Sequence, residues 1–237
     1  MKKTVIISHK ADEMINLLRN DGYDIIMTEP NKSVDERIAD HADISFFFDG
    51  NDTLFVAKEL SHSAEKLRKF CKNIIILGDN LGDIYPSDVR LNCVRLGNFF
   101  ICNTNTVSQT ILSHINKLGC TVIDVSQGYT KCSVVPVNNN SIITDDKSVA
   151  DSCKAYGIDV LYISKGDVLL SGFSYGFIGG TAGLLSYNKL YFNGDISFHN
   201  NFKYIKEFLD ERNVDFACVT KSLTDIGSII PLYKIQE

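Results

Sequence analysis

The sequence contains a pattern that recurs five times along almost its whole length. Five short apolar segments, rich in β-branched or aromatic residues and ending in polar residues, begin 43 to 49 residues apart. Segments of this kind are typical of buried strands. A repeat of this period constrains the fold strongly, because each unit must stack against its neighbours to bury its apolar face. The segments begin at Val5, Leu54, Phe99, Ile142 and Leu190.

Each apolar segment is followed by a stretch with helical spacing and then by two further strands. The helical stripe is clearest in the third repeat, where Val107, Ile111, Ile115 and Leu118 fall on one face. The second strands are predicted at residues 23–28, 74–77, 121–125, 158–163 and 214–219. The third strands are predicted at residues 44–48, 89–96, 133–137, 167–170 and 226–232.

The repeating unit is therefore strand–helix–strand–strand, with three strands for each helix. An ordinary doubly wound α/β sheet alternates strands and helices one for one. We therefore expect an α/β protein folded as a five-bladed α/β propeller, in which ring closure protects the edges of each small sheet. The predicted single domain covers residues 1–237, with blades at about 4–51, 52–97, 98–140, 141–188 and 189–237.

Composition and charge exclude several classes of protein. The net charge of −5 argues against general binding to nucleic acid or to an acidic membrane. The first ten residues contain three consecutive apolar residues, whereas a signal peptide needs about 7–15. No run approaches the roughly 20 apolar residues of a transmembrane helix. Seven cysteines, an odd number without a CxxC pair, indicate reduced thiols and a cytoplasmic location.

Several local motifs resemble those of a known fold. The segment Ser164-Lys-Gly-Asp-Val-Leu-Leu is similar to the Glu-Gly-Gly-Asp-Val strand of the deiminases, and Ile230-Pro-Leu-Tyr-Lys to their Met-Pro-Leu-Tyr-Arg ending. With the five-part repeat, these motifs make the whole chain resemble the pentein, or guanidino-modifying-enzyme, fold. That fold includes arginine and agmatine deiminases, dimethylarginine hydrolases, amidinotransferases and a ribosome anti-association factor. Further segments, which begin at Gln127, Gly176 and Asn193, resemble an uncharacterised bacterial family assigned to it.

The sequence departs from the catalytic members of that fold at the residues that carry their chemistry. The resemblance implies a cysteine nucleophile a few residues before the C-terminal Pro-Leu, where this chain has Gly227 and Ser228. The expected acidic residue falls on Ser164, and the expected histidine falls near Asn193 or Gly194. Attack on a guanidinium carbon needs a thiolate, a proton donor and carboxylates. Because only the carboxylates remain, we expect a pseudoenzyme that does not carry out standard deiminase chemistry.

The ends of the five first strands are expected to meet at one rim of a central channel. Convergent polar groups in a concave site are typical of ligand binding, and paired carboxylates such as Asp145 and Asp195 could hold a guanidinium or an amine. The alternative is structural, because Asn105, Asp145 or Asp146, and Ser197 also precede predicted helices, where such residues serve as N-caps. The candidate ligand-binding residues are Asn103, Asn105, Asp145, Asp195, Asp225 and Lys131.

Cys132 is the one cysteine with a chemically suggestive neighbourhood and is a catalytic candidate. The ammonium of Lys131 could depress its thiol pKa, although strand alternation can equally bury Cys132 as a small apolar residue. The glycines between residues 172 and 183 lack a following helix and are expected to form turns rather than a phosphate loop. Scattered histidines and the absence of an HExxH motif predict neither a metal site nor a cofactor.

Three functions are compatible with these residues. The favoured hypothesis is binding of a small polar or cationic ligand in the central channel without cysteine-dependent hydrolysis. The second is a protein-interaction module, as the resemblance to the ribosome anti-association factor implies. The third is a hydrolase that uses Cys132 or a pair of acidic residues.

Overall fold

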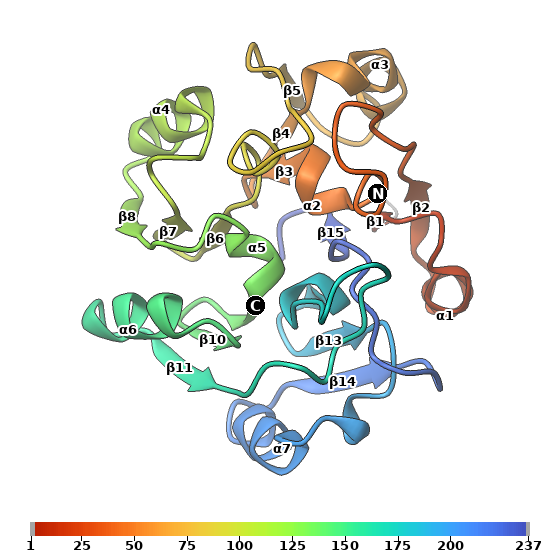
Figure 1. The fold of residues 1–237 in the computed structure, drawn as a ribbon, viewed down its shortest axis with the longest axis vertical. Helices are drawn as coiled ribbons and strands as arrows, with labels where there is room; N and C mark the ends of the chain where they lie inside the picture. The colour runs from red at the N-terminus through yellow and green to blue at the C-terminus, as the bar shows by residue number, and fades with distance from the viewer. Residues whose placement is uncertain (1–2, 236–237) are drawn as a thin grey trace.

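Five small sheets surround a common centre, and the longer helices lie on the outside of the ring (Figure 1). The computed structural model describes residues 3–235, so residues 1–2 and 236–237 of the predicted domain lie outside the described residues. From the inner to the outer strand, the sheets are β15 (Ile230–Pro231), β1 (Thr4–Ile7) and β2 (Asp24–Met27); β3 (Phe46–Phe48), β4 (Thr53–Val56) and β5 (Asn73–Ile76); β6 (Val94–Leu96), β7 (Phe99–Cys102) and β8 (Thr121–Asp124); β9 (Val134–Asn138), β10 (Ser141–Thr144) and β11 (Asp159–Tyr162); and β12 (Ala182–Ser186), β13 (Lys189–Phe192) and β14 (Asp215–Cys218).

Every sheet combines strands from two successive repeats. The middle strand pairs in parallel with the outer strand that follows it and antiparallel with the inner strand that precedes it. The last inner strand, β15, pairs with β1 through Val5 opposite Pro231 and Ile6 opposite Ile230, and so closes the ring. The predicted five-bladed α/β architecture is confirmed, with each sheet taking its inner strand from the repeat before.

The inner strands lie next to one another around the centre of the ring. β9 contacts both β6 and β12, and β15 contacts both β3 and β12. The strands that open the repeats occupy the middle of each sheet, one strand further out. The expectation that their ends form the central rim is therefore wrong. The reason is that each of these strands is flanked on both sides, by its own second strand and by the third strand of the preceding repeat.

Helical segments connect the middle and outer strands of each blade. They are α1 (Asp12–Asn20), η1 (Lys58–Ser63) with α3 (Ala64–Leu67), α4 (Gln109–Lys117), α6 (Lys147–Ala155), and η3 (Ile196–Phe198) with α7 (Phe202–Asp210). Ile111 and Ile115 of α4 are completely buried, as their helical spacing predicts. Asp146 caps α6 by accepting from the amides of Ser148 and Val149.

The other expected caps are provided by different residues. Ser108 rather than Asn105 caps α4, because its hydroxyl accepts from the amide of Thr110. At the start of η3, Asp195 accepts from the amide of Ser197, so Ser197 is a donor to the cap and not the cap itself. In both cases the cap is the polar residue directly next to the first helical turn.

The strand predicted at residues 167–170 is absent, and the inner strand that the fourth repeat supplies to the next sheet is β12. Leu169 makes only an isolated bridge with Thr224. Val168 is buried in the core although it lies in a loop. The apolar sequence around it therefore resembles that of a strand. β12 follows the short turn η2 (Gly179–Thr181) and contains Gly183, where a Cβ atom would lie 2.5 Å from the carbonyl oxygen of Ile229. The glycine-rich segment is thus partly a strand that needs close backbone approach.

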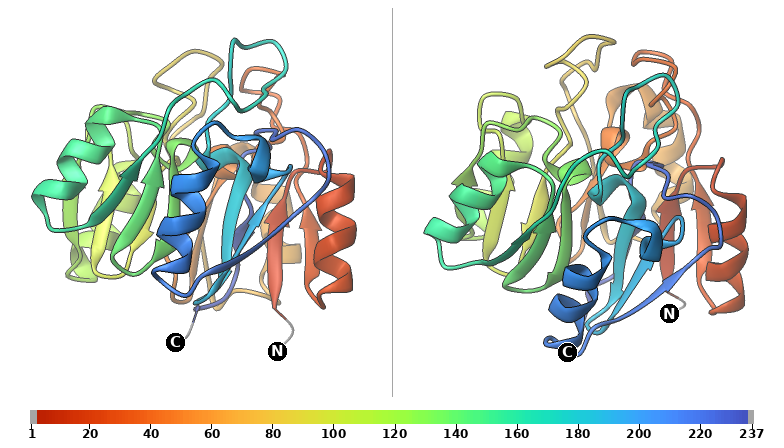
Figure 2. Two further views of the ribbon diagram at one scale, coloured as in Figure 1. Left: turned by 90° about the horizontal axis from the view of Figure 1, so that it is seen from below. Right: turned by 60° about the horizontal axis from the view of Figure 1, so that its bottom comes forward.

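The two ends of the ring differ. Long connections around residues 30–40, 78–92 and 164–178 project from one end, and the described chain begins and ends at the other (Figure 2). We call these the loop end and the terminal end. Apolar clusters fill the spaces between neighbouring blades and under the helices. Within residues 3–235, no helix has the length and apolar character needed to cross a membrane.

Candidate functional site

The segments that precede the inner strands bring polar side chains together at the centre of the ring. Asp43 comes from α2 (Ala42–Ser45), Lys131 and Cys132 from α5 (Thr130–Ser133), and Asn92 and Ser228 from the turns before β6 and β15. The fourth repeat contributes the backbone of Gly179 in η2. These positions are equivalent in the five repeats, so the fold itself converges them. The central cluster is defined here as Asp43, Asn92, Lys131, Cys132, Asp225 and Ser228.

Lys131 and Asp43 meet on the hydroxyl of Ser228. The ammonium Nζ of Lys131 donates to Ser228 Oγ at 2.8 Å and to the carbonyl of Gly179 at 3.3 Å. Ser228 Oγ lies 2.6 Å from Asp43 Oδ2 and donates to this carboxylate. Partial burial lowers the pKa of Lys131, and Asp43 is the largest opposing influence. The ammonium is therefore held by two uncharged acceptors. Its countercharge is the carboxylate of Asp43, which is linked to it through the hydroxyl of Ser228.

Ser228 itself is held in an uncommon backbone conformation. Its φ is +70°, in the left-handed region that costs a residue with a side chain free energy. Its amide donates to the carbonyl of Gly180, which fixes the turn immediately before β15. The conformation places a hydroxyl, with no exposed surface, between Lys131 and Asp43.

Asn92 and Asp43 fix the position of Cys132. The Asn92 Oδ1 atom accepts from the amides of Lys131 and Cys132, at 2.7 and 3.2 Å. The thiol of Cys132 lies 3.3 Å from Asp43 Oδ2 and 3.1 Å from Asn92 Nδ2. Burial raises the pKa of the Cys132 thiol, and the carboxylates of Asp43 and Asp225 raise it further. At neutral pH this side chain is a thiol and not a thiolate.

The loop around residues 177–179 brings Asp145 and Asp225 to the same place. The amide of Phe177 donates to Asp225 Oδ2 at 3.0 Å, and the next amide, of Ile178, donates to Asp145 Oδ2 at 3.1 Å. Burial raises the pKa of both carboxyl groups, that of Asp145 to about 7. His41 Nδ1 lies 3.7 Å from Asp225 Oδ1.

Aromatic side chains surround the cluster on the side of the loop end. The ring of Tyr129 stacks on that of Phe177 with centroids 6.0 Å apart, and its other neighbour is Tyr85 at 6.0 Å. The hydroxyl of Tyr129 donates to Asp88 Oδ2. Burial raises the pKa of Asp88. Lys165 Nζ lies 5.8 Å from the centroid of Phe177.

Three buried carboxylates in this region each have one oxygen that no described residue satisfies. These atoms are the Oδ1 atoms of Asp43, Asp88 and Asp145. A buried polar atom without a partner is costly, and in native proteins it usually meets water, an ion or a ligand. Hydrogen-bond capacity at the centre is therefore biased towards acceptors, which is the arrangement that an N–H-bearing cation would complement.

The structure unites some of the candidate residues and separates others. Lys131, Asp145 and Asp225 all contact the segment of residues 177–179. Asn103 instead donates to the carbonyl of Ser126 and accepts from the amide of Asn105, which makes a local turn. Asn105 is exposed, and Asp195 caps η3.

Four residues of the site are not among the candidate binding residues predicted from the sequence: Asp43, Asp88, Asn92 and Ser228. Superposing the repeats at the starts of their third strands, rather than at the ends of their first, would have found three of them. Asp88 lies in a long loop and carries no such signal. Across residues 3–235, no three His, Cys, Asp or Glu side chains come together in a way that could hold a metal ion.

Solved structures with the same fold are guanidino-modifying enzymes. A dimethylarginine dimethylaminohydrolase from Pseudomonas aeruginosa, a cysteine-to-serine mutant complexed with citrulline, matches with a TM-score of 0.59 and 10% identity over 93% of this chain and 92% of that one. An amidinotransferase from Microseira wollei, of the saxitoxin biosynthetic pathway, has a TM-score of 0.61 and 9% identity over 97% and 82%. The agmatine deiminase of C. jejuni has a TM-score of 0.53 and 9% identity over 92% and 88%.

These similarities establish the pentein fold, and the identities are too low to transfer an activity. No curated protein is significantly similar to the chain in sequence. A family model does match it, over residues 6–230, which is nearly the whole chain. The chain therefore belongs to the family of unknown function DUF6873 and has the pentein fold.

Proposed function

We propose that this protein binds a small cationic ligand, an amine or a guanidine compound, at the loop end of the ring. The observation that carries the proposal is the excess of buried acceptors. Asp88 accepts from the Tyr129 hydroxyl and Asp145 accepts from the amide of Ile178, next to Phe177, and each has an unsatisfied Oδ1 atom. The rings of Tyr129 and Phe177 stack on each other. Carboxylate oxygens bind N–H groups of cations strongly, and an aromatic face adds about 2 kcal/mol when the cation is desolvated.

The central cluster forms the floor of this proposed site. Lys131 remains partly exposed, whereas Asp43, Cys132 and Ser228 beneath it are buried. A cationic ligand would therefore be held by Asp88 and Asp145 at the loop end and would not reach Ser228. The solved relatives named above are, by name, a dimethylarginine hydrolase, an amidinotransferase and an agmatine deiminase, so their substrates belong to the same chemical class.

We propose further that the ligand is bound without cysteine-dependent hydrolysis. Nucleophilic attack requires a thiolate. The Cys132 thiol has a raised pKa and lies against Asp43, a neighbour that disfavours its ionisation. A protein that turned over a guanidine compound with loss of activity in Cys132→Ala would contradict this part of the proposal.

Thermal unfolding against a panel of cations tests the binding. The panel is agmatine, arginine, citrulline, putrescine and spermidine, with citrulline as the uncharged-side-chain comparison. A ligand at about 100 times its dissociation constant stabilises by about 2.7 kcal/mol, which raises the Tm by about 5–10 °C. Asp145→Asn and Asp88→Asn should reduce the shift at the same concentration.

Asp215→Asn is the matched control, because Asp215 is an exposed carboxylate on the outer strand β14. It should leave the shift unchanged. A shift that survives both Asp145→Asn and Asp88→Asn would place the ligand elsewhere. A flat response to the whole panel at millimolar concentration would reject a cation site and favour the protein-interaction module.

A further inference from the structure

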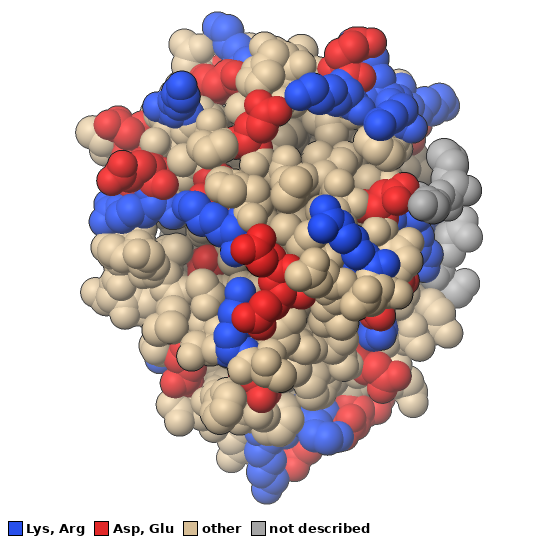
Figure 3. Space-filling view, turned by 90° about the vertical axis from the view of Figure 1, so that its right-hand side faces the viewer, with Lys and Arg blue, Asp and Glu red and all other residues tan. Residues whose placement is uncertain are grey.

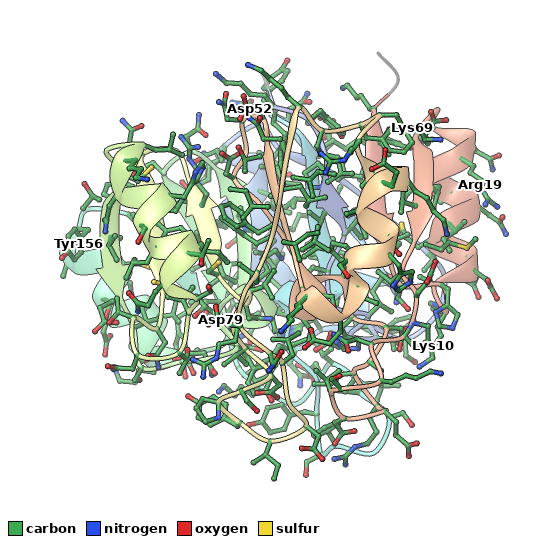
Figure 4. The ribbon with its side chains drawn as sticks, turned by 90° about the horizontal axis from the view of Figure 1, so that it is seen from above. Lys10, Arg19, Asp52, Lys69, Asp79 and Tyr156 are labelled. Carbon is green, nitrogen blue, oxygen red and sulfur yellow. The ribbon has the colours of Figure 1, made fainter. Side chains whose placement is uncertain are left out.

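A second candidate site lies at the terminal end of the ring, away from the carboxylates of the loop end. A cavity of about 530 Å³ opens between the blade of β15, β1 and β2 and the blade of β3, β4 and β5. Figure 4 shows Asp52 and Lys69, which line it, at one end of the molecule, and Asp79 and Lys10 towards the other. Its volume lies within the range of about 300–1,000 Å³ that is usual for small-molecule sites.

The cavity has an apolar wall that the neighbouring blades leave partly exposed. Phe48 and Phe70 lie at the edge of the apolar cluster between the two blades, and each keeps part of its surface accessible. Leu232 is buried behind them. Tyr233 contributes a ring whose hydroxyl donates to the carbonyl of Leu185, so the ring is held in place. Fixed aromatic faces of this kind receive a flat apolar group at little entropic cost.

Basic side chains surround this apolar wall. The lining residues include four lysines and two aspartates, in a chain whose net charge is −5. Lys72 Nζ lies 3.6 Å from Asp52 Oδ2. Lys3 and Lys69 instead lie over rings, 5.7 Å from the centroid of Tyr233 and 4.8 Å from that of Phe70. Figure 3 shows Lys and Arg side chains gathered at the upper right of that view, towards the terminal end.

We propose that this cavity binds a small organic anion with an aromatic or other flat apolar body. The ammonium groups of Lys3 and Lys69 would meet the anionic group, and the rings of Phe48 and Phe70 would contact the body. A concave, low-dielectric surface strengthens the field of such lysines and raises the local concentration of anions. The inference is independent of the cation site proposed above, since it concerns the opposite end and the opposite charge.

Fluorescence titration with 8-anilinonaphthalene-1-sulfonate, an aromatic anion, tests this site. We expect saturable binding at 50 mM salt that weakens at 300 mM salt, because exposed charges are screened. The double variant Lys3→Gln/Lys69→Gln should bind at least 10-fold more weakly. The matched control Lys117→Gln/Lys154→Gln removes two exposed lysines from the ends of α4 and α6 and should bind within twofold of the unchanged protein.

A neutral analogue of the probe, N-phenyl-1-naphthylamine, separates charge from simple apolar adsorption and should bind at least 10-fold more weakly. Displacement by adenosine monophosphate or by naphthoate would identify a phosphate or a carboxylate as the preferred anion. Non-saturable fluorescence, equal binding of the neutral analogue, or unchanged binding in Lys3→Gln/Lys69→Gln would overturn the proposal. Asp145→Asn should not alter this titration, so failure of one site is distinguishable from failure of the other.

Discussion

At the scale of single residues, the centre of the ring is organised by one ammonium group. Lys131 Nζ binds Ser228 Oγ and the Gly179 carbonyl, and Ser228 in turn donates to Asp43. Asp43 also has an oxygen that no described residue satisfies. The free energy of this arrangement therefore depends on a positive charge near a buried carboxylate, although the two groups do not touch directly.

Lys131→Met should destabilise the fold by about 1–3 kcal/mol, because it removes a donor from Ser228 and from Gly179 and leaves Asp43 without the nearby charge. Urea unfolding measures the change. Lys154→Met, on the exposed end of α6, is the control and should change stability by less than about 0.5 kcal/mol. Equal stability of the two variants would show that the Lys131 charge contributes nothing to the cluster.

Asp145 should make stability fall as the pH rises from about 4 to about 7. Its pKa in the folded protein is about 7 because of burial, against 3.8 when exposed, so the folded state retains a proton that the unfolded state has lost. This contribution to the free energy of unfolding is fully present below the pKa that Asp145 has in the unfolded chain. It is lost as the pH rises to the pKa of Asp145 in the folded protein, and the loss is up to ~4 kcal/mol.

Asp145→Asn should flatten that part of the profile, measured by urea unfolding at pH 4.5 and pH 7.5. Asp88 and Asp225 also have raised pKa values, so they too make stability fall as the pH rises. The effect of Asp145 is therefore the difference between the pH profiles of Asp145→Asn and the unchanged protein. Asp215→Asn serves as the control. A profile that Asp145→Asn leaves unaltered would show that Asp145 titrates normally.

Sequence reasoning reached only part of this site, for a physical reason. Asp145, Asp225 and Lys131 stand out because they are charged residues next to predicted strands. Asp43 and Ser228 precede strands that are only three and two residues long, and whether such a strand is inner or outer depends on pairing between repeats. Local pattern does not encode that pairing, so Asp43 and Ser228 stand out only when the repeats are superposed at the starts of their third strands.

At the scale of elements, the ring depends on inner strands that are short and unequal. β15 contains only Ile230 and Pro231, yet its pairing with β1 closes the circle. Ile230 is also part of the apolar cluster between the first two blades, with Ile6 and Leu232. Packing must therefore supply most of the stabilisation at this closure, because two residues form few ladder hydrogen bonds.

Ile230→Ala should cost about 2–4 kcal/mol, since it removes a buried side chain at the closure and leaves a cavity beside Ile6. Chemical denaturation gives the value. The comparison is Ile84→Ala, because Ile84 is 72% exposed in a loop, and this change should fall within about 0.5 kcal/mol. A similarly small loss for Ile230→Ala would mean that ring closure does not limit stability.

The elements with strong local signals were predicted well, and the exception is instructive. The middle and outer strands and the helices α1, α4, α6 and α7 occur within a few residues of their expected positions. The inner strand β12 was missed because Gly183 and the glycines before it resemble a turn. The opposite error is the strand predicted at residues 167–170, which is absent. Val168 and Leu170 are apolar because they pack against the core from a loop.

At the scale of the whole molecule, the two ends of the ring have different chemistry. The loop end presents buried carboxylates and stacked aromatic rings, whereas the terminal end presents lysines around a cavity. Loops from different blades also touch across the loop end. Arg37 Nη1 donates to the carbonyl of Gly172 at 2.9 Å, and its guanidinium lies 4.0 Å from the centroid of Phe173. This contact joins the connection between β2 and β3 to the connection between β11 and β12.

Arg37→Ala should loosen the loop of residues 165–178 without unfolding the ring. Arg37 contacts this loop at Gly172 and Phe173, and both of these residues lie at the surface. Loss of the contact should therefore affect local opening of the loop more than global stability. Hydrogen exchange of peptides covering residues 165–178 should become faster, while exchange in β10 and β13 stays the same. Arg68→Ala, which removes an exposed arginine paired with Glu65 on the side of α3, should leave both rates unchanged. If exchange of the loop is equally slow in Arg37→Ala, other contacts hold the loop of residues 165–178 in place.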